Sequence, residues 1–576
     1  MMTTLNQFMA PLMPHLMLAP ILLPMLTAAL MLMLREEQQR LKIGLNIGST
    51  LLGLLVSIAL LCWANGQGAA RTMDVYLAGN WPAPYGIVLV LDRLSALMLV
   101  LSSSVGFASV LFAIARWHRA GVHFHPLFQL QLMGLCGAFL TADLFNLFVF
   151  FEIMLAASYG LLLHGSGRAR VQSGLHFIAI NLAASSLFLI GASMLYGLTG
   201  TLNMADLARS IGAIKEADRN LLHAASGILA LAFLIKAAVW PLNFWLVPAY
   251  SAASAPVGAL FAIMTKVGIY AILRLWTLLF GVEAGASAQF GSLWLVIGGM
   301  LTMVFGALGM LGSQRLSYLA GYGAILSSGS LLSAIGFGQV QLTAGLLYYL
   351  PSSTLAISAL FLLADLMDRW RNDGATASPF EEDAPFLNAE LVSTRGLNLD
   401  EDEEVLTGRV IPAAVAFLGL AFMACTLVIA GLPPLSGFVG KFAMLSALLN
   451  PLGLGASGGQ QPGSANWALL ILLIGTGLLA LIALTRIGIL HFWAASDRAA
   501  PKLRWLEGLP VAALLATCVG LTVQAGPVMD YMQATARVLH TPAMYVQAVM
   551  SAQPVLRMDL VGRTGAINPA DVKDAR

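Results

Sequence analysis

Charged side chains are scarce in this sequence of 576 residues. Asp, Glu, Lys and Arg together make up 10% of the chain, whereas hydrophobic residues make up 59%. A soluble domain needs far more polar surface than this composition provides, so a soluble globular protein is excluded. The composition instead predicts a protein embedded in membrane lipid, for which we expect no nucleic-acid partner.

Cysteine is also rare, and motifs for bound groups are missing. The four cysteines, Cys62, Cys136, Cys425 and Cys518, all lie in apolar stretches without CxxC spacing. They are therefore expected to be small core residues rather than disulfide or metal-binding residues. The sequence contains no nucleotide, haem, flavin or metal motif, so we expect neither a cofactor nor a metal.

Lysine is the third scarce residue, and its few positions are informative. Of the seven lysines, Lys236, Lys266 and Lys441 lie well inside long apolar stretches, as does Glu152. A charge near the centre of a bilayer costs roughly 3 kcal/mol even on the insertion scale, so such residues usually carry protons, ions or substrate. These four residues are the candidate functional residues.

Apolar segments of membrane-spanning length fill most of the chain. A spanning helix needs about 20 residues, so the sequence predicts an all-α polytopic membrane protein with about fourteen transmembrane helices. The first segment lacks a preceding basic region and is expected to be a membrane helix rather than a cleaved signal peptide. The expected spans are 16–34, 41–63, 93–115, 126–142, 144–163, 174–198, 221–247, 254–275, 290–312, 315–336, 343–366, 411–449, 467–493 and 508–532.

Basic residues in the predicted loops indicate the orientation. An even number of helices places both termini on one side, and the loops richest in Arg and Lys belong in the cytoplasm. This predicts that both termini lie outside, on the side of the membrane away from the cytoplasm. The long polar connection at 368–408 would then be cytoplasmic, with acidic clusters at 381–383 and 400–404. We expect a solvated loop there, with a docking surface for a partner protein as the alternative.

Two proline-containing segments interrupt the helical pattern deep in the membrane. The first contains Pro241, and the second contains Pro433, Pro434 and Gly437. Proline leaves a backbone carbonyl unpaired, so such breaks persist only where they are buried in protein or line a polar cavity. The breaks fall in helices 7 and 12, which predicts two inverted five-helix repeats with a site near the membrane midplane.

The repeats divide the chain into four expected regions. Helices 1–3 occupy residues 1–125, and helices 4–8 form the first repeat at 126–275. Helices 9–13 form the second repeat at 290–495, which includes the acidic loop. The last helix and a polar C-terminal tail follow at 508–576.

The four buried charged residues are suited to a proton relay. Burial in a low-dielectric site disfavours the charged form of a lysine, and a nearby carboxylate favours it. Movement of Glu152 towards or away from Lys236 would then switch whether the lysine holds its proton. A static ion pair that only fixes helix packing is the alternative for any single residue. For the three lysines as a set this alternative is weaker, because Glu152 is the one carboxylate that lies well inside an apolar stretch with them.

Several other polar residues are weaker candidates. Asp143, at the end of the fourth span, is either a helix-boundary residue or a proton entry point. His176 lies near a helix end, where a histidine is more often interfacial than functional. The serines within 327–330 and 352–353 could hold water in the middle of a relay, but hydroxyls that pack helices together are the commoner case.

Four segments, taken in order, resemble one family. They are NLFVFFEIM at 146–154, KAAVWPLNFWL at 236–246, APVGALFAIMTKVGIY at 255–270 and GLPPLSGFVGK at 431–441. Over about residues 90–495 the chain resembles the antiporter-like membrane subunits shared by respiratory complex I and the multisubunit Mrp (Pha) cation/proton antiporters.

Within that superfamily the chain looks most like the D-type subunits of the Mrp (Pha) antiporters. It lacks the long C-terminal membrane extension expected of the A-type subunits. It also lacks the lateral helix expected of the largest antiporter-like subunit of complex I. In the twelfth helix it has Lys441, where another complex I subunit has a glutamate.

The resemblance implies a role for each candidate residue. Glu152 and Lys236 would form the ion pair of a first half-channel. Lys266 would be the central relay lysine, and Lys441 would be the terminal proton-carrying residue of a second half-channel.

The chain departs from the family pattern at two places. Tyr250 stands where many relatives have a histidine, and the eleventh span, from Tyr348 to Asp365, has neither histidine nor lysine. Proton transfer between Lys266 and Lys441 would then depend on hydroxyls and water.

The sequence therefore predicts a proton-translocating subunit of a Na⁺ or K⁺/H⁺ antiporter, a transporter and not an enzyme. The resemblance implies partner subunits of the A, B, C, E, F and G types. The alternative is a proton-pumping membrane subunit of a complex I-like or hydrogenase-type redox complex, whose membrane part would look nearly the same. A packing scaffold with inert charges is a third class, in which removal of Lys236 or Lys441 would affect assembly but not transport.

Overall fold

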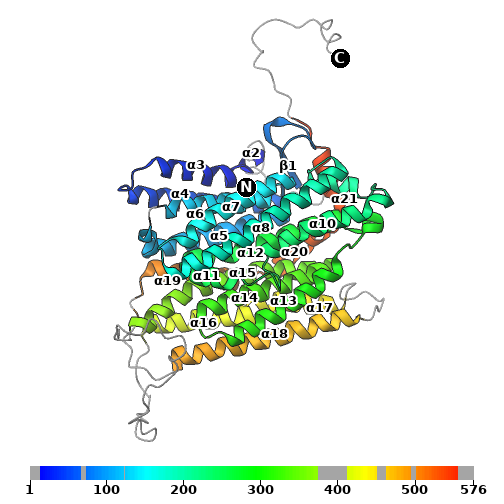
Figure 1. Cartoon of the computed structure of the whole chain (residues 1–576). Coiled ribbons are helices and arrows are strands. Elements are labelled where there is room, and N and C mark those ends of the chain that lie inside the picture. The colour runs from blue at the N-terminus through cyan, green and yellow to red at the C-terminus, as the bar shows by residue number, and fades with distance from the viewer. Residues whose placement is uncertain are drawn as a thin grey trace, which may run out of the picture.

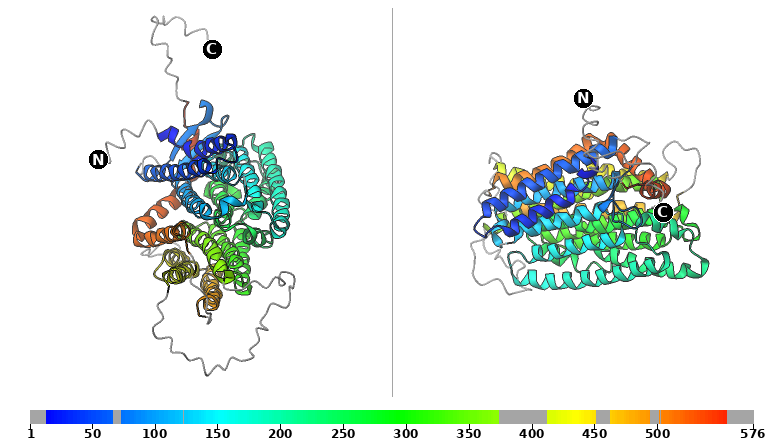
Figure 2. Two further views of the ribbon diagram at one scale, coloured as in Figure 1. Left: turned by 90° about the vertical axis from the view of Figure 1, so that its left-hand side faces the viewer. Right: turned by 90° about the horizontal axis from the view of Figure 1, so that it is seen from above.

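Long helices lie side by side and run nearly parallel, so that the protein forms one large helical bundle (Figure 1). The computed structural model describes residues 13–66, 73–121, 123–373, 412–450, 462–493, 501 and 503–554. In the left view of Figure 2 most of the helices are seen nearly end-on, so that each one projects as a ring.

The helices confirm an all-helical, multi-pass membrane protein. Among the described residues, twelve helices are long and apolar enough to cross a membrane, and three shorter helices are also apolar. The helices that correspond to the expected spans are α3 (Ala19–Met33), α4 (Gln39–Gly66), α5 (Arg93–Ala115), α6 (Phe124–Leu140), α7 (Leu144–Leu163), α8 (Arg168–Thr199), α10 (Glu216–Lys236), α11 (Leu246–Ala252), α12 (Ala255–Leu279), α13 (Ser292–Gly312), α14 (Leu316–Gly336), α15 (Val340–Asp373), α16 (Ala413–Ala430), α17 (Ser436–Leu449), α18 (Ser464–Gly488) and α19 (Trp505–Val523).

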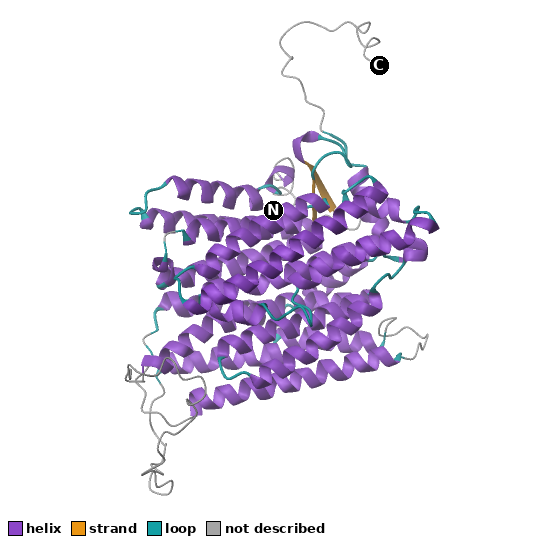
Figure 3. Ribbon diagram, in the orientation of Figure 1, coloured by secondary structure: helices purple, strands orange, loops and turns teal. Residues whose placement is uncertain are grey.

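A small β-hairpin departs from the all-α prediction (Figure 3). Strand β1 (Met73–Leu77) pairs antiparallel with β2 (Val88–Asp92), and Met73 lies opposite Asp92. Every residue of β2 is buried. Its four apolar residues are separated from α5 by Asp92 alone, and hydropathy does not distinguish so short an apolar run from the start of a helix.

The C-terminal region contains more helix than expected. Instead of one span at 508–532 and a polar tail, α19 is followed by α20 (Ala525–Leu539) and α21 (Pro542–Met550). Helix α20 packs against α15, so it is part of the bundle. Hydropathy misses such an amphipathic helix because its polar face lowers the mean value. The buried residues of α20 are Met532, Thr535, Ala536 and Leu539.

Helix α15 lies at the centre of the bundle and is longer than expected. It continues through Pro351 and past the predicted end at 366, into the segment expected to be a polar loop. It packs against α12, α14, α16, α17, α19 and α20. Helices α12 and α15 are buried along the whole of their most hydrophobic stretch, so polar side chains on them face protein and not lipid. The acidic clusters at 381–383 and 400–404 lie outside the described residues.

Candidate functional site

Lys236 is the last residue of α10 and lies where the first helix break begins. The chain turns over residues 237–245 before α11 starts, and the Trp240–Pro241 peptide is cis. The free backbone N–H of Trp240 donates to Thr302 Oγ1 at 2.9 Å, so α13 satisfies part of the broken backbone. This backbone group is therefore satisfied by protein, as an apolar environment requires, although the side chains of Trp240 and Phe244 are exposed.

The Lys236 side chain is buried without a hydrogen-bonding partner. Only 6% of the residue is exposed, and no described group lies within hydrogen-bonding distance of its Nζ. The Nζ lies 5.1 Å from the centre of the Phe151 ring, a distance typical of a cation–π contact. This lysine is therefore held in place by packing and by an aromatic face.

Glu152 follows Phe151 on α7, so that it lies near Lys236 without an ion pair between them. The half-buried carboxylate of Glu152 accepts a hydrogen bond from the Ser185 hydroxyl on α8. Glu152 acts electrostatically on Lys236, although the ion pairs among the described residues do not include the two. The resemblance implies a direct ion pair. The structure instead shows two neighbouring charges, of which Glu152 accepts a hydrogen bond from Ser185 and Lys236 lies against the Phe151 ring.

Lys266 lies in the middle of α12 and is completely buried. Its Nζ donates to Ser327 Oγ at 2.9 Å and to Ser328 Oγ at 3.4 Å, both on α14. Ser327 Oγ in turn donates to Ser353 Oγ on α15, at 2.9 Å. Three helices thus meet in a chain of polar groups around this lysine. The sequence favours helix packing as the role of these serines, whereas the structure shows that two of them contact the lysine directly.

Lys441 lies on α17, just after the second helix break. Its Nζ donates to the carbonyl oxygens of Ile429 and Ala430, at 3.2 and 2.9 Å. These are the last residues of α16, whose final carbonyls have no partner within their own helix. A cation is also favoured at a helix C-terminus by the helix dipole. The break therefore creates the acceptors that hold the lysine.

The second break has little room at its proline-rich turn. The Pro433–Pro434 peptide is cis, and α17 begins two residues later. At Gly437 a Cβ would lie 2.0 Å from the Val428 carbonyl oxygen. Only glycine fits there, because the backbone of α17 approaches the backbone of α16 so closely.

The weaker candidates lie away from direct contact with the lysines. Asp143 caps the N-terminus of α7, where its Oδ1 accepts from the Asn146 backbone N–H at 2.8 Å; this is the geometry of a helix-boundary residue. His176 is exposed and lines a cavity of about 500 Å³ between α8, α11 and the start of α14. Tyr250 is buried beside Trp245, and its hydroxyl has no hydrogen-bond partner in the part of the chain described here.

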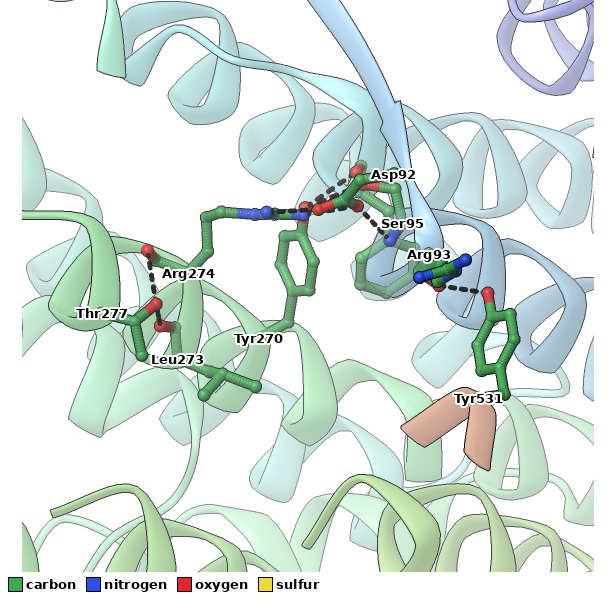
Figure 4. A network of polar contacts seen from close by, with 9 residues as sticks. Asp92, Arg93, Ser95, Tyr270, Leu273, Arg274, Thr277 and Tyr531 are labelled. Carbon is green, nitrogen blue, oxygen red and sulfur yellow. Dashed lines mark hydrogen bonds and ion pairs between the residues drawn. The ribbon is translucent and has the colours of Figure 1, made fainter. Parts of the chain in front are cut away.

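Arg274, on the same helix as Lys266, forms a buried ion pair with Asp92 that sequence analysis missed (Figure 4). Arg274 contacts Asp92 through two bonds, Nη1 to Oδ2 at 2.6 Å and Nη2 to Oδ1 at 2.8 Å. Asp92 also caps α5 through the backbone N–H of Ser95. Hydropathy places Arg274 at a loop boundary, and the partners are 182 residues apart in sequence, so no local pattern could pair them.

The two kinds of buried charge differ in their partners. Asp92 and Arg274 neutralise each other in a bidentate pair, the geometry of a fixed structural link. Among the described residues, none of Lys236, Lys266 and Lys441 has a carboxylate within 4.0 Å. Lys266 and Lys441 donate to neutral oxygens. Such lysines can give up or accept a proton without breaking an ion pair.

Comparisons with known proteins show the family to which this chain is similar. The family described as NADH:quinone oxidoreductase/Mrp antiporter, transmembrane, matches residues 141–382. The D subunit of a probable K⁺/H⁺ antiporter from Rhizobium meliloti (strain 1021) is 51% identical over 539 residues, which cover 93% of this chain and 98% of the relative. The D subunit of a Na⁺/H⁺ antiporter from Alkalihalophilus pseudofirmus is 32% identical over 547 residues, 93% of this chain and all of the relative.

The fold also occurs in a solved structure. A chain of the Mrp complex from Dietzia sp. DQ12-45-1b superposes with a TM-score of 0.76 at 24% sequence identity. The match covers 94% of this chain and 99% of the other. At this identity the likeness concerns the fold alone.

Proposed function

Because this chain belongs to the family of D-type Mrp antiporter subunits, within the superfamily of complex I antiporter-like membrane subunits, we propose that it moves protons across the membrane in exchange for Na⁺ or K⁺. It is then part of a transporter rather than an enzyme. The relatives are named for different cations, K⁺ in one and Na⁺ in the other. The cation is therefore part of what must be measured.

The observation that carries this proposal is the absence of carboxylate partners within 4.0 Å of Lys236, Lys266 and Lys441 in the described ranges. Lys42 is also buried, but it lies in the first turn of α4, near the end of a span, where a charge costs less than at the centre. A lysine buried only for stability would normally be paired, because an isolated buried charge is costly. The buried bidentate pair of Asp92 with Arg274 shows what a structural charge looks like in this protein. The lysines differ from it and are suited to changing their protonation state.

In the proposed mechanism, Glu152, Lys236, Lys266 and Lys441 form a proton path through the interior. A proton on one lysine raises the energy of a proton on the next by Coulomb repulsion, which is strong at low dielectric. Loading at one end therefore promotes release at the other. Cation movement in the opposite direction would be driven by the same change in charge.

The helix breaks support an architecture of two inverted repeats. We assign helices α6, α7, α8, α10 with α11, and α12 to the first repeat, and α13, α14, α15, α16 with α17, and α18 to the second. In this assignment, which gives fourteen crossings in all, the fourth element of each repeat is broken near a buried lysine. Broken helices at matching positions are typical of transporters whose site lies between two repeats.

The remaining parts of the proposal concern location and partners. We infer that the complex lies in the bacterial inner membrane, with both termini in the periplasm and with subunits of the A, B, C, E, F and G types around it. The cavity that His176 lines opens at the end of the bundle where Arg315 lies. We assign this end to the cytoplasm because it is rich in arginine.

Cation-driven proton movement in everted membrane vesicles tests the function. Vesicles carry the complete complex, respiration acidifies their interior, and a pH-sensitive dye reports the pH difference. We expect KCl or NaCl to dissipate the difference, and choline chloride to leave it unchanged. Vesicles with a complex that lacks this chain are the control and should not respond. If the assembled complex ignores both cations but moves protons when a quinone-linked reductant is supplied, the redox-driven alternative is correct.

A further inference from the structure

The polar path between Lys266 and Lys441 must cross α15, which has no titratable nitrogen in its central part. Between Tyr348 and Asp365 this helix has neither histidine nor lysine. The serine cluster around Lys266 consists of Ser327, Ser328 and Ser353, and it reaches α15 at Ser353. The groups available to carry a proton from there towards Lys441 are therefore the hydroxyls of α14 and α15.

Tyr349 occupies the position between the two lysines. It is buried, with 2% of its surface exposed. Its hydroxyl interacts with those of Ser327 and Ser330 on α14, and Ser327 is the residue that receives the bond from Lys266. On its other side, the Tyr349 ring lies beneath Lys441, whose Nζ is 6.0 Å from the ring centre. One side chain thus contacts the surroundings of both lysines.

The backbone brings α15 and α17 together at this residue. At Gly440, the neighbour of Lys441, a Cβ would lie 2.9 Å from the Tyr349 Cα. A larger residue would push the two helices apart and move Lys441 away from the tyrosine. Pro351, two residues beyond Tyr349, removes one hydrogen bond from α15 and leaves a polar backbone group in the same part of the interior.

We propose that Tyr349, together with Ser327, carries protons between Lys266 and Lys441. The proposal rests on the proposed function, since it describes one step of the same path. The Lys266 ammonium gives a proton to Ser327, whose hydroxyl turns from Ser353 to Tyr349 and passes on its own proton. Tyr349 then passes its hydroxyl proton through bridging water to the Lys441 amine. One N–H bond breaks at Lys266 and one forms at Lys441, and both hydroxyls end protonated. A hydroxyl suits this role because it donates and accepts at once.

The adjacent tyrosine provides a matched control. Tyr348 is also completely buried on α15, but its hydroxyl donates to the Leu521 carbonyl on α19 at 2.8 Å. That bond is directed to a backbone oxygen, away from the serine cluster. Replacing either tyrosine by phenylalanine removes one buried hydroxyl and leaves the ring in place, but only one of the two hydroxyls lies on the proposed path.

The test compares Tyr349→Phe with Tyr348→Phe in the cation-driven vesicle assay, at equal amounts of assembled complex. We expect Tyr349→Phe to slow exchange by about tenfold or more, which is less than the roughly 10²–10⁴-fold of a general acid or base because water can partly replace the lost hydroxyl. Tyr348→Phe should exchange at nearly the wild-type rate. Should Tyr349→Phe fail to assemble, Ser327→Ala replaces it in the comparison, and the same slowing is expected.

Two results would overturn the proposal. One is exchange at the wild-type rate by the assembled Tyr349→Phe complex, or by Ser327→Ala where it takes its place. The other is an equal loss in both tyrosine variants, which would assign the effect to packing. Lys441→Ala, measured alongside, separates this step from the function itself. A Lys441→Ala complex that exchanges normally contradicts the proposed function, whereas its failure beside a normal Tyr349→Phe complex rejects only the hydroxyl bridge.

Discussion

Replacing Lys266 with methionine is expected to reduce cation-driven proton exchange by about 10²-fold or more, the scale on which a missing proton-transferring group acts. Methionine has a similar length and fits a buried apolar environment, so assembly should be retained. Ser327 and Ser328 would lose the donor that they share. The proposed path would then be interrupted at its most buried residue.

Lys266→Arg separates charge from proton transfer. Arginine keeps the positive charge and hydrogen-bond donors, but it stays protonated under all physiological conditions. The relay therefore predicts that Lys266→Arg is inactive although assembled. Lys42→Met is the control, because Lys42 is another buried lysine, on α4, outside the proposed path. Full exchange by Lys266→Arg would show that only the charge at this position matters.

The second large effect is expected at Lys236 and Glu152, which we infer act as one unit. Lys236→Met and Glu152→Gln should each slow exchange by about tenfold or more. Because the two charges interact, the double variant should be little slower than either single variant. Independent sites would instead multiply their losses, to about a hundredfold for two tenfold effects. The measurement is the vesicle exchange rate for the four proteins of this double-mutant cycle.

Ser185→Ala is the control for that cycle. It removes the hydroxyl that donates to Glu152 but leaves both charges in place. A loss smaller than that of Glu152→Gln is expected. If Ser185→Ala were as slow as Glu152→Gln, the position of the carboxylate and not its charge would be the important property.

The sequence predicted the fold well where hydropathy alone determines it. The long apolar spans and the two proline breaks are local properties, because a spanning helix needs only length and apolar side chains. The sequence missed the β-hairpin and α20, which depend on packing against the bundle. Strand β2 is too short to distinguish from a helix start, and α20 buries only one face.

The candidate residues could be named from the sequence, but their contacts could not. The rarity of lysine in the membrane identified Lys236, Lys266 and Lys441 as the residues to examine. Their partners come from tertiary structure, as with Ser327, which is 61 residues from Lys266 in sequence. The carbonyls that hold Lys441 become available only because α16 ends beside it. Neither type of acceptor gives a local signal.

The most direct test of the buried relay uses the purified complete complex in proteoliposomes, with a pH-sensitive dye trapped inside. A K⁺ or Na⁺ gradient is imposed, and the rate of internal pH change is compared between wild type and Lys441→Ala. The relay predicts a rapid change in the wild type and a change no faster than leakage in the variant. Equal rates in the two proteins would contradict it and would leave Lys441 with a structural role only.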